Sequence, residues 1–309
     1  MSTLSQTLYF LSQELGFDDM GIAPCGSMEE QRVFYMDWIQ NGYQAGMGYM
    51  ERNIDKRLDP GLLVEGAKSV IVLLKNYFPE NSLPETDNYI LAKYAYGNDY
   101  HDVIREKLNI LVDTIKAQTG SIQTRGFVDS APVLERAWAV RAGLGWIGKN
   151  SCLIHPQEGS FFFISVIITD QEMEYSTGIQ TNLCGSCRRC LDSCPTGAIV
   201  QPMVIDARKC ISYLTIENKG EIPEDFKGKL NSRIFGCDIC QDVCPWNRKP
   251  VPHHESALKP KPGLFAMNRE RWKSLTKAEF DNLFRKSAVK RTKYSGLMRN
   301  VNFVSEEDE

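Results

Sequence analysis

Residues 184–195 read CGSCRRCLDSCP, and residues 237–245 read CDICQDVCP. In the first stretch, gaps of two residues separate three cysteines, and a gap of three residues leads to a fourth cysteine followed by proline. Two-residue gaps let successive thiolates converge on one metal cluster from a tight loop. The longer gap places the fourth thiolate apart from the first three, and the proline prevents the loop from continuing as a helix. The second stretch repeats the end of this pattern after an isolated cysteine, Cys210. The two stretches therefore predict two cluster-binding loops.

This spacing is the bacterial ferredoxin pattern, in which the fourth cysteine of a run ligates the other of two clusters. The half-motifs therefore predict two [4Fe–4S] clusters that lie close together. By the crossover rule, one cluster is held by Cys184, Cys187, Cys190 and Cys244. The other is held by Cys194, Cys210, Cys237 and Cys240. The long gap after Cys210 makes residues 211–236 an insertion, which we expect to be functional or docking structure.

Two zinc sites or a disulfide framework are the alternatives. Zinc sites usually come as separated pairs of cysteines, and the run at residues 184–195 is poor zinc geometry. The N-terminus has neither the basic region nor the apolar core of a signal peptide, so we expect a cytoplasmic protein. Without export, closely spaced cysteines indicate metal binding. The other two cysteines, Cys25 and Cys152, lie in no ligand pattern and are expected to be ordinary half-buried thiols.

The composition is typical of a globular protein that is large enough for two domains with their own cores. The chain has 309 residues, of which 42% are hydrophobic and 24% charged. Its longest apolar stretch, residues 161–168, is too short to cross a membrane and predicts a buried strand. With a net charge of −3, the chain as a whole lacks the excess of basic residues that is typical of nucleic-acid-binding proteins. Charge is uneven, however: residues 284–300 carry basic side chains and no acid, and the acidic tail at residues 306–309 is expected to be disordered.

Hydrophobic periodicity predicts alternating helices and strands in the first part of the chain. Helices are expected over residues 4–15, 29–40, 104–119 and 133–142, and strands over residues 20–24, 70–74, 126–128 and 161–168. This alternation indicates an α/β (α+β) domain over residues 1–175. A ferredoxin-like domain with the two clusters follows over residues 176–252. Residues 253–309 are expected to form a proline-rich linker, a helical segment that packs back on the body, and the acidic tail.

The first domain lacks the signals of common nucleotide-binding domains. No phosphate-binding loop is present, and the nearest match to a dinucleotide motif, GLGWIGK at residues 143–149, follows a predicted helix instead of a strand. It is therefore a weak dinucleotide signal. Another ligand must occupy this domain.

Several further motifs together are specific. They are MGYM at residues 47–50, RLDP at 57–60, YAYGNDYH at 94–101, VDSAPVLER at 128–136, GLGWIGKN at 143–150 and RN at 299–300. With the eight clustered cysteines, these motifs resemble the epoxyqueuosine reductases over nearly all of residues 1–300. Some members of that family carry a helical-repeat extension at the C-terminus. This sequence shows none after Asn300, so we expect its tRNA contacts to lie elsewhere.

The resemblance implies a fold, cofactors and an activity. A base-off cobalamin is expected between the first domain and the cluster domain, and the implied reaction reduces the epoxide of epoxyqueuosine to queuosine at the wobble position of tRNA. The clusters would receive electrons from a low-potential donor of the flavodoxin or ferredoxin type, and we expect a monomer without membrane contact. Two alternatives stay open: a cobalamin-dependent reductase similar to the reductive dehalogenases, and a two-cluster ferredoxin that only carries electrons.

Asp129 is the candidate catalytic residue. It follows a predicted strand and precedes a predicted helix, a position that places a carboxyl at the edge of a sheet, where ligands bind. By resemblance it donates a proton to the departing epoxide oxygen. A carboxyl with this role near neutral pH needs a raised pKa, which burial against the corrin and the substrate would provide. The alternative is that Asp129 only caps the helix that follows it.

The resemblance also implies a set of cofactor-binding residues: Arg57, Ala92, Asp99, His101, Asp129, Gly148, Lys149, Asn150, Leu153 and Ser212. Amides and the phosphate of the cofactor need donors such as Arg57 and Lys149, although a salt bridge or a solvated side chain is the alternative for each. Glycines at 143, 145 and 148 would allow a flat ligand to approach the backbone. A role for His101 as the lower cobalt ligand is a further alternative, but we expect it to shape the pocket together with Asp99.

A tRNA substrate requires phosphate contacts near the mouth of the pocket. The candidates are the basic residues of the insertion and of the C-terminal stretch: Lys219, Lys290, Arg291, Lys293 and Arg299. Bases read in an unpaired state often stack on aromatic rings, so Tyr213 and Tyr294 are candidates for stacking. For every one of these residues, a solvated surface position or a core position is the alternative.

Overall fold

The structure is a computed structural model, and it describes residues 3–121, 123–178 and 181–305. The predicted disorder of the acidic tail, residues 306–309, falls outside the described residues. Within the described part of the chain, no helix combines the length and the apolar character needed to span a bilayer.

A four-stranded sheet forms the centre of the first domain. Its strands, in spatial order, are β1 (Asp19–Pro24), β2 (Ser69–Asn76), β7 (Phe162–Thr169) and β4 (Thr124–Val128). All three pairings are antiparallel, and Val72 lies opposite Val166 in the central pair. Every residue of β2 is buried, because helices cover both faces of the sheet.

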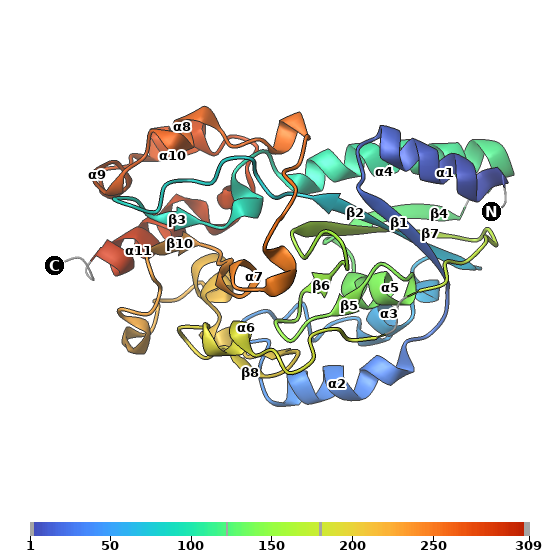
Figure 1. The fold of residues 1–309 in the computed structure, drawn as a ribbon, viewed down its shortest axis with the longest axis horizontal. Coiled ribbons are helices and arrows are strands. Elements are labelled where there is room, and N and C mark those ends of the chain that lie inside the picture. Colours follow the sequence, from blue (N-terminus) through green and yellow to red (C-terminus); the bar gives the residue numbers. More distant parts are fainter. Residues whose placement is uncertain (1–2, 122, 179–180, 306–309) are drawn as a thin grey trace.

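Helices α1 (Thr3–Glu14) and α4 (Tyr100–Thr119) cover one face of the sheet, and α5 (Glu135–Arg141) covers the other (Figure 1). Odd residues of β2, such as Ile71, pack in one hydrophobic cluster with α1 and α4, and even residues, such as Val72, pack in a second cluster with α5. This division follows from the two-residue period of a strand. Further helices of this part of the chain are α2 (Glu29–Gln40) and α3 (Ile54–Leu58).

The predicted elements of the first domain are confirmed, with two differences in detail. The sheet is antiparallel throughout, so the domain belongs to the α+β class and not to the α/β class, in which the strands are mostly parallel. Helix α5 begins at Glu135, two residues later than predicted, because the residues after Asp129 form an irregular turn.

The cluster-binding region consists of short elements. They are β5 (Trp146–Ile147), β6 (Leu153–Ile154), α6 (Arg189–Asp192), β8 (Ile199–Gln201), β9 (Val204–Ile205), a 3₁₀ turn η3 (Ala207–Lys209), α7 (Ile239–Asp242) and a 3₁₀ turn η6 (Pro245–Asn247). Helices α6 and α7 lie side by side at the centre of the molecule (Figure 1).

The insertion and the C-terminal segment form a third body of structure. The insertion contains a π-helical turn η4 (Tyr213–Glu217), a 3₁₀ turn η5 (Glu224–Phe226) and β10 (Arg233–Phe235), which pairs in parallel with β3 (Ile90–Leu91). The remaining elements are η1 (Pro60–Leu62), η2 (Lys93–Ala95), η7 (Ser256–Leu258), α8 (Pro262–Phe265), α9 (Arg269–Lys273), α10 (Lys277–Leu283), η8 (Ala288–Thr292) and α11 (Lys293–Ser305).

One hydrophobic cluster joins these segments. It contains Tyr89 from the first domain, Ile234 from the insertion, and Trp272 and Val301 from the C-terminal helices. The C-terminal segment therefore packs back on the body, as predicted. The insertion packs between this segment and the first domain. The predicted division of the chain at residues 175 and 252 stays a prediction.

Candidate functional site

The first set of cysteines surrounds one cavity of about 390 Å³. Its lining includes Cys184, Cys187, Cys190 and Cys244, although Cys244 is distant from the other three in sequence. Burial, together with the neighbouring Cys184 and Cys244, raises the pKa of the Cys190 thiol to about 11. The chain thus brings four sulfur donors together around a space, and this donor set fits one iron–sulfur cluster.

The second set also converges. Burial raises the pKa of the Cys210 thiol, and the neighbouring Cys194 raises it further. Burial likewise raises the pKa of Cys237 to about 12, with a contribution from Cys210, and Cys240 lies near both Cys237 and Cys210. Among the described residues, no three His, Cys, Asp or Glu side chains lie close enough to share one metal ion. The thiolates of a cluster site bind separate irons, so they do not need to lie that close to one another.

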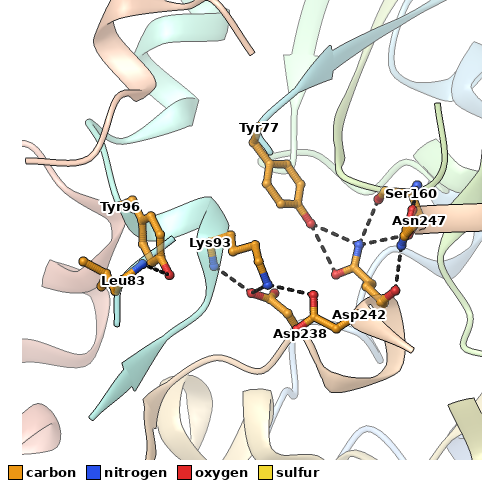
Figure 2. A network of polar contacts seen from close by, with 9 residues as sticks. Tyr77, Leu83, Lys93, Tyr96, Ser160, Asp238, Asp242 and Asn247 are labelled. Carbon is orange, nitrogen blue, oxygen red and sulfur yellow. Dashed lines mark hydrogen bonds and ion pairs between the residues drawn. The ribbon is translucent and has the colours of Figure 1, made fainter. Parts of the chain in front are cut away.

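A polar network holds the second cysteine loop against the first domain (Figure 2). The buried Gln241 of α7 exchanges hydrogen bonds with Tyr77 at 3.2 and 3.3 Å and donates to the Ser160 carbonyl at 2.9 Å. On the other side of the loop, the Lys93 ammonium lies 3.6 Å from the Asp238 carboxylate and 2.7 Å from that of Asp242. The sequence between the cysteines therefore fixes how the cluster loop sits on the sheet domain.

Asp129 lies directly after β4 and is the centre of a second polar group. Its backbone has a φ of 47°, a left-handed conformation that aspartate tolerates better than most residues. The Tyr100 hydroxyl donates to Asp129 Oδ2 at 2.6 Å, and His101 Nε2 lies 3.7 Å from the same oxygen. His101 Nδ1 is 2.7 Å from Asp99 Oδ1, and Asp99 also caps α4 by accepting from the His101 backbone N–H at 3.0 Å.

This geometry bears on two of the predicted alternatives. Asp129 does not cap α5, because the residue at that cap is Leu134, which makes no side-chain capping hydrogen bond. His101 Nδ1 is bonded to Asp99, and Nε2 faces Asp129 at 3.7 Å, an arrangement that disfavours His101 as a cobalt ligand. The His101 ring also stacks on Tyr100, with ring centres 4.0 Å apart, and Tyr100 stacks on Phe163 of β7 at 4.1 Å.

In the protein alone the pKa of Asp129 is lowered, and the rise expected from burial against the corrin and the substrate stays a prediction. Desolvation by the surrounding walls raises the pKa of the Asp129 carboxyl, but hydrogen bonding to His101 and Tyr100 outweighs this effect and lowers it below the usual value. For His101, burial lowers the pKa, and the two aspartates outweigh it and raise the pKa to about 9. At neutral pH the shared proton therefore resides on His101. The Asp129 side chain is 63% exposed, so solvent and substrate can reach it.

Several buried polar atoms have no hydrogen-bond partner. Among the described residues they include Gln44 Oε1, Arg57 Nε, Glu135 Oε1 and Ser151 Oγ, and Glu135 is close enough to Asp129 for the charge of Asp129 to raise its pKa. Arg57 is only 8% exposed, and its Nη2 donates to the Tyr49 carbonyl at 2.9 Å. Buried polar groups usually have partners. A ligand rich in amide donors and acceptors, such as the corrin of cobalamin, fits this donor set.

Other residues predicted to bind the cofactor are hydrogen-bonded to other parts of the chain. The Lys149 ammonium donates to the carbonyls of Gly185 and Cys187 at 2.6 and 2.8 Å, and Asn150 Nδ2 donates to the Cys240 carbonyl at 3.1 Å. A Cβ on Gly148 would lie 2.5 Å from Ile154, and a Cβ on Gly143 or Gly145 would also meet backbone. The glycines therefore admit neighbouring chain segments at these points, where a close approach of the ligand was expected.

Ala92 and Leu153 are both buried, at 2% and 3% exposure, and Ala92 N–H donates to the Phe235 carbonyl at 2.7 Å. Ser212 lies beside the Cys210 thiol.

The predicted tRNA-binding residues separate into two kinds. Lys219, Lys290, Arg291 and Lys293 are exposed. Arg299 is an internal clamp, because its guanidinium donates to the carbonyls of Leu214, Asn218 and Gly220 at 2.9, 2.8 and 2.5 Å. These bonds attach α11 to the insertion. The hydroxyls of both aromatic candidates are also engaged, Tyr213 with Gly46 N–H and Tyr294 with the Leu275 carbonyl.

Sequence reasoning missed three members of the Asp129 group. Tyr100 was the easiest to find, since it directly precedes His101 at the start of a helix. Burial, with a contribution from Asp129, raises the pKa of the Glu135 carboxyl to about 7. Arg291 is close enough to Asp129 for its charge to lower the pKa of that carboxyl, and it pairs with Glu217 at 2.7 Å. The proximity of Arg291 to Asp129 has no signal in the sequence.

Comparisons with known proteins agree with this geometry. The family model described as "4Fe-4S double cluster binding domain" matches residues 183–247, and the one described as "Epoxyqueuosine reductase QueG, DUF1730" matches residues 57–130. A protein from Cyclobacterium marinum named epoxyqueuosine reductase is 49% identical, over 99% of both chains. The relatives favour neither the electron carrier nor the dehalogenase alternative.

Two solved structures are similar over nearly the whole chain. A crystal structure of epoxyqueuosine reductase with an epoxyqueuosine-modified tRNA stem loop has a TM-score of 0.91 and 31% identity, over 98% of this chain and 81% of that one. The epoxyqueuosine reductase of Bacillus subtilis, with its catalytic aspartate loop swung out of the active site, has a TM-score of 0.89 and 30% identity, over 98% and 81%. The chain is therefore an oxidoreductase of the epoxyqueuosine reductase family, with two [4Fe–4S] clusters among its cofactors.

Proposed function

We propose that this chain reduces the epoxide of epoxyqueuosine at the wobble position of tRNA, giving the alkene of queuosine. The observation that carries the proposal is the exposed Asp129 carboxyl, held by Tyr100 and His101 on the same body as two converging sets of cysteines. The similar structure that contains a modified tRNA stem loop supports the substrate. The reaction takes two electrons and two protons, and it releases the epoxide oxygen as water.

The electron path begins at the cysteines. One cluster is ligated by Cys184, Cys187, Cys190 and Cys244, and the other by Cys194, Cys210, Cys237 and Cys240. A cluster passes one electron at a time, whereas the reaction needs a pair. Cobalamin, when bound, would supply the two-electron chemistry that the clusters alone lack. The donor to the clusters is a low-potential protein of the flavodoxin or ferredoxin type.

The proton path uses the group around Asp129. The carboxyl delivers a proton from Oδ2 to the departing oxygen, and the raised pKa of His101 makes the imidazolium the store of that proton at neutral pH. Asp99 holds the imidazole in place through Nδ1. The lowered pKa of Asp129 favours this division of roles over a carboxyl that is itself protonated at rest.

The buried polar atoms without partners indicate which residues would hold cobalamin. Arg57, with its unpaired Nε, is the principal candidate, and Gln44 and Ser151 would add contacts. His101 would not be a cobalt ligand of the expected base-off cofactor, since its Nδ1 faces Asp99 and its Nε2 faces Asp129. We further propose a monomer that acts in the cytoplasm, where its tRNA substrate is found.

Phosphate contacts would come from the exposed basic side chains of the insertion and of the C-terminal segment: Lys219, Lys290, Arg291 and Lys293. Glu217 of the insertion and Arg291 of η8 form an ion pair, so these two segments adjoin each other beside the Asp129 group. An anticodon loop gripped at this point would present its wobble base to the carboxyl.

The test is turnover of tRNA taken from cells that lack epoxyqueuosine reduction. Anaerobically reconstituted protein should bind about eight irons and one cobalamin. With a low-potential reductant it should convert the wobble nucleoside to queuosine, which mass spectrometry would detect. Uptake of two zinc ions without cobalamin, or an unchanged nucleoside with both cofactors bound, would contradict the proposal.

A further inference from the structure

A tight turn, residues 148–152, connects β5 to β6 and lies between the two cysteine loops. Gly148 N–H donates to the Cys152 carbonyl at 2.8 Å, and Ser151 N–H donates to the Gly148 carbonyl at 2.8 Å. The flanking strands pair in register, with Ile147 opposite Leu153. The turn is therefore a rigid support for the side chains that it carries.

The turn is anchored to the second cysteine loop. Asn150 is only 2% exposed, and its Nδ2 donates to the Cys240 carbonyl at 3.1 Å while its Oδ1 accepts from Cys152 N–H at 3.3 Å. The Cys152 thiol also lies beside the Cys240 thiol, so Cys152 is more than the isolated thiol expected from the sequence. These contacts fix the position of the residue between Gly148 and Asn150.

That residue is Lys149, and it reaches the first cysteine loop. Its ammonium donates to the Gly185 and Cys187 carbonyls at 2.6 and 2.8 Å, and it lines the cavity that four cysteines share. Within the described residues, no carboxylate lies at ion-pair distance from it. The nearest negative charge in the assembled protein would therefore be that of the cluster and its thiolates.

We propose that Lys149 sets the reduction potential of the cluster bound by Cys184, Cys187, Cys190 and Cys244. This inference rests on the cluster ligation proposed above. Net charge and hydrogen bonding around a cluster are among the factors that determine its potential. A fixed, half-buried ammonium favours the reduced cluster, which carries one more negative charge, because Coulomb interactions are weakly screened there. Lys149 is thus a tuning residue of the electron path and does not touch the substrate.

The decisive variant is Lys149→Gln, which keeps a donor for the loop carbonyls and removes the charge. Its cluster potentials should be measured by redox titration followed by electron paramagnetic resonance, with iron content determined on the same samples. We expect full iron, one potential shifted to a more negative value and the other nearly unchanged. Lys149→Arg, which keeps the charge, should restore a potential close to that of the wild type.

Two controls locate the effect. Arg188 lies on the same loop but is exposed and pairs with Asp192 at 3.5 Å, so Arg188→Gln should leave both potentials unchanged. In a Cys190→Ala background, which is expected to keep only the other cluster, Lys149→Gln should not move the remaining potential.

Several outcomes would overturn the inference. They are unchanged potentials in Lys149→Gln at full iron, an equal shift in Arg188→Gln, or loss of a cluster from both Lys149→Gln and Lys149→Met, which would make Lys149 an assembly residue. A wild-type protein that takes up no clusters would count against the proposed function itself, so the two failures are distinguishable.

Discussion

The cysteine loops and the Asp129 group are assembled in opposite ways. Three of the proposed ligands of the first cluster come from one short loop, residues 184–190, and Cys244 comes from a distant part of the sequence. The Asp129 group draws on β4, the start of α4 and, at longer range, η8. The local spacing of residues can specify a cluster site, because its ligands are of one residue type at fixed intervals. A proton-transfer site depends on which different side chains meet, and the packing of the helices on the sheet decides that.

The two regions also differ electrostatically. The cysteine loops hold thiols whose pKa is raised by burial, and they present a cation, Lys149, to the cluster cavity. The Asp129 group holds a carboxylate with a lowered pKa beside an imidazole with a raised one. Electrons and protons are thus handled by separate groups of residues, and variants in one region should leave the function of the other measurable.

The largest effect is expected for Asp129→Asn. Loss of an acid catalyst typically lowers the rate by about 10²–10⁴-fold. Both clusters and cobalamin should be retained, because Asp129 is not one of the cluster ligands. Single-turnover conversion of modified tRNA, read by mass spectrometry, measures the rate, and absorbance spectra of the same sample report the cofactors. Turnover close to that of the wild type would remove Asp129 from the chemistry.

A smaller effect, on the order of tenfold at neutral pH, is expected for His101→Gln, which removes the proton store but keeps Asp129. The pH dependence is the sharper readout. Because the pKa of His101 is raised to about 9, the active, protonated form is present at neutral pH and is lost as the pH rises through about 9. The wild-type rate should therefore fall above this pH.

Asp99→Asn provides the matched variant for this prediction. It weakens one of the two interactions that raise the pKa of His101, so the fall in rate should move to lower pH. In His101→Gln the fall should disappear. A wild-type profile that stays flat up to about pH 10, one unit above the pKa of His101, would contradict the role of His101 as the proton store.

An effect of about twofold, on bound iron, is expected for Cys190→Ala, because one of two clusters loses a ligand. Iron content and the electron paramagnetic resonance of the remaining cluster measure it. Cys25→Ala is the control: Cys25 lies in a hydrophobic cluster with Leu58 and away from both cysteine sets, so its iron content should stay at the wild-type value. Equal iron in both variants would show that Cys190 is not a ligand.

The smallest effect is expected when Lys290, Arg291 and Lys293 are changed to glutamine together. Lys290 and Arg291 already pair with Asp281 and Glu217, which offsets part of any gain from tRNA phosphates. Removing one cation that binds a phosphate lowers the salt slope of tRNA binding by about one, so the slope should fall by up to about three. Cofactor spectra should not change.

Lys116→Gln, in the last turn of α4, is the control for this triple variant. It removes an exposed charge from another part of the surface and should leave the salt slope unchanged. If the triple variant and the control have the same slope as the wild type, the basic run is a solvated helix face.

The sequence by itself determined the elements and the cluster ligands' spacing. Periodicity predicted α4, whose buried Ile104, Leu108 and Ile115 recur at helical spacing, and an apolar run predicted β2, which is buried on both faces. Cysteine intervals predicted two groups because a loop of fixed length can reach only a nearby cluster. The packing of the C-terminal helices on the body could be predicted too, since their apolar residues require a partner surface.

Only the tertiary structure decided what the polar residues do. Asp129 looked like a helix cap or a buried acid. It is instead a largely exposed carboxylate whose pKa is lowered, because α4 places Tyr100 and His101 within reach of it. Lys149 and Arg299 looked like ligand-binding cations, and their donors are taken by backbone carbonyls of distant loops. The physical reason is the same in each case: the charge state and the partners of a polar side chain depend on atoms within a few ångströms, and residues far apart in the sequence supply those atoms.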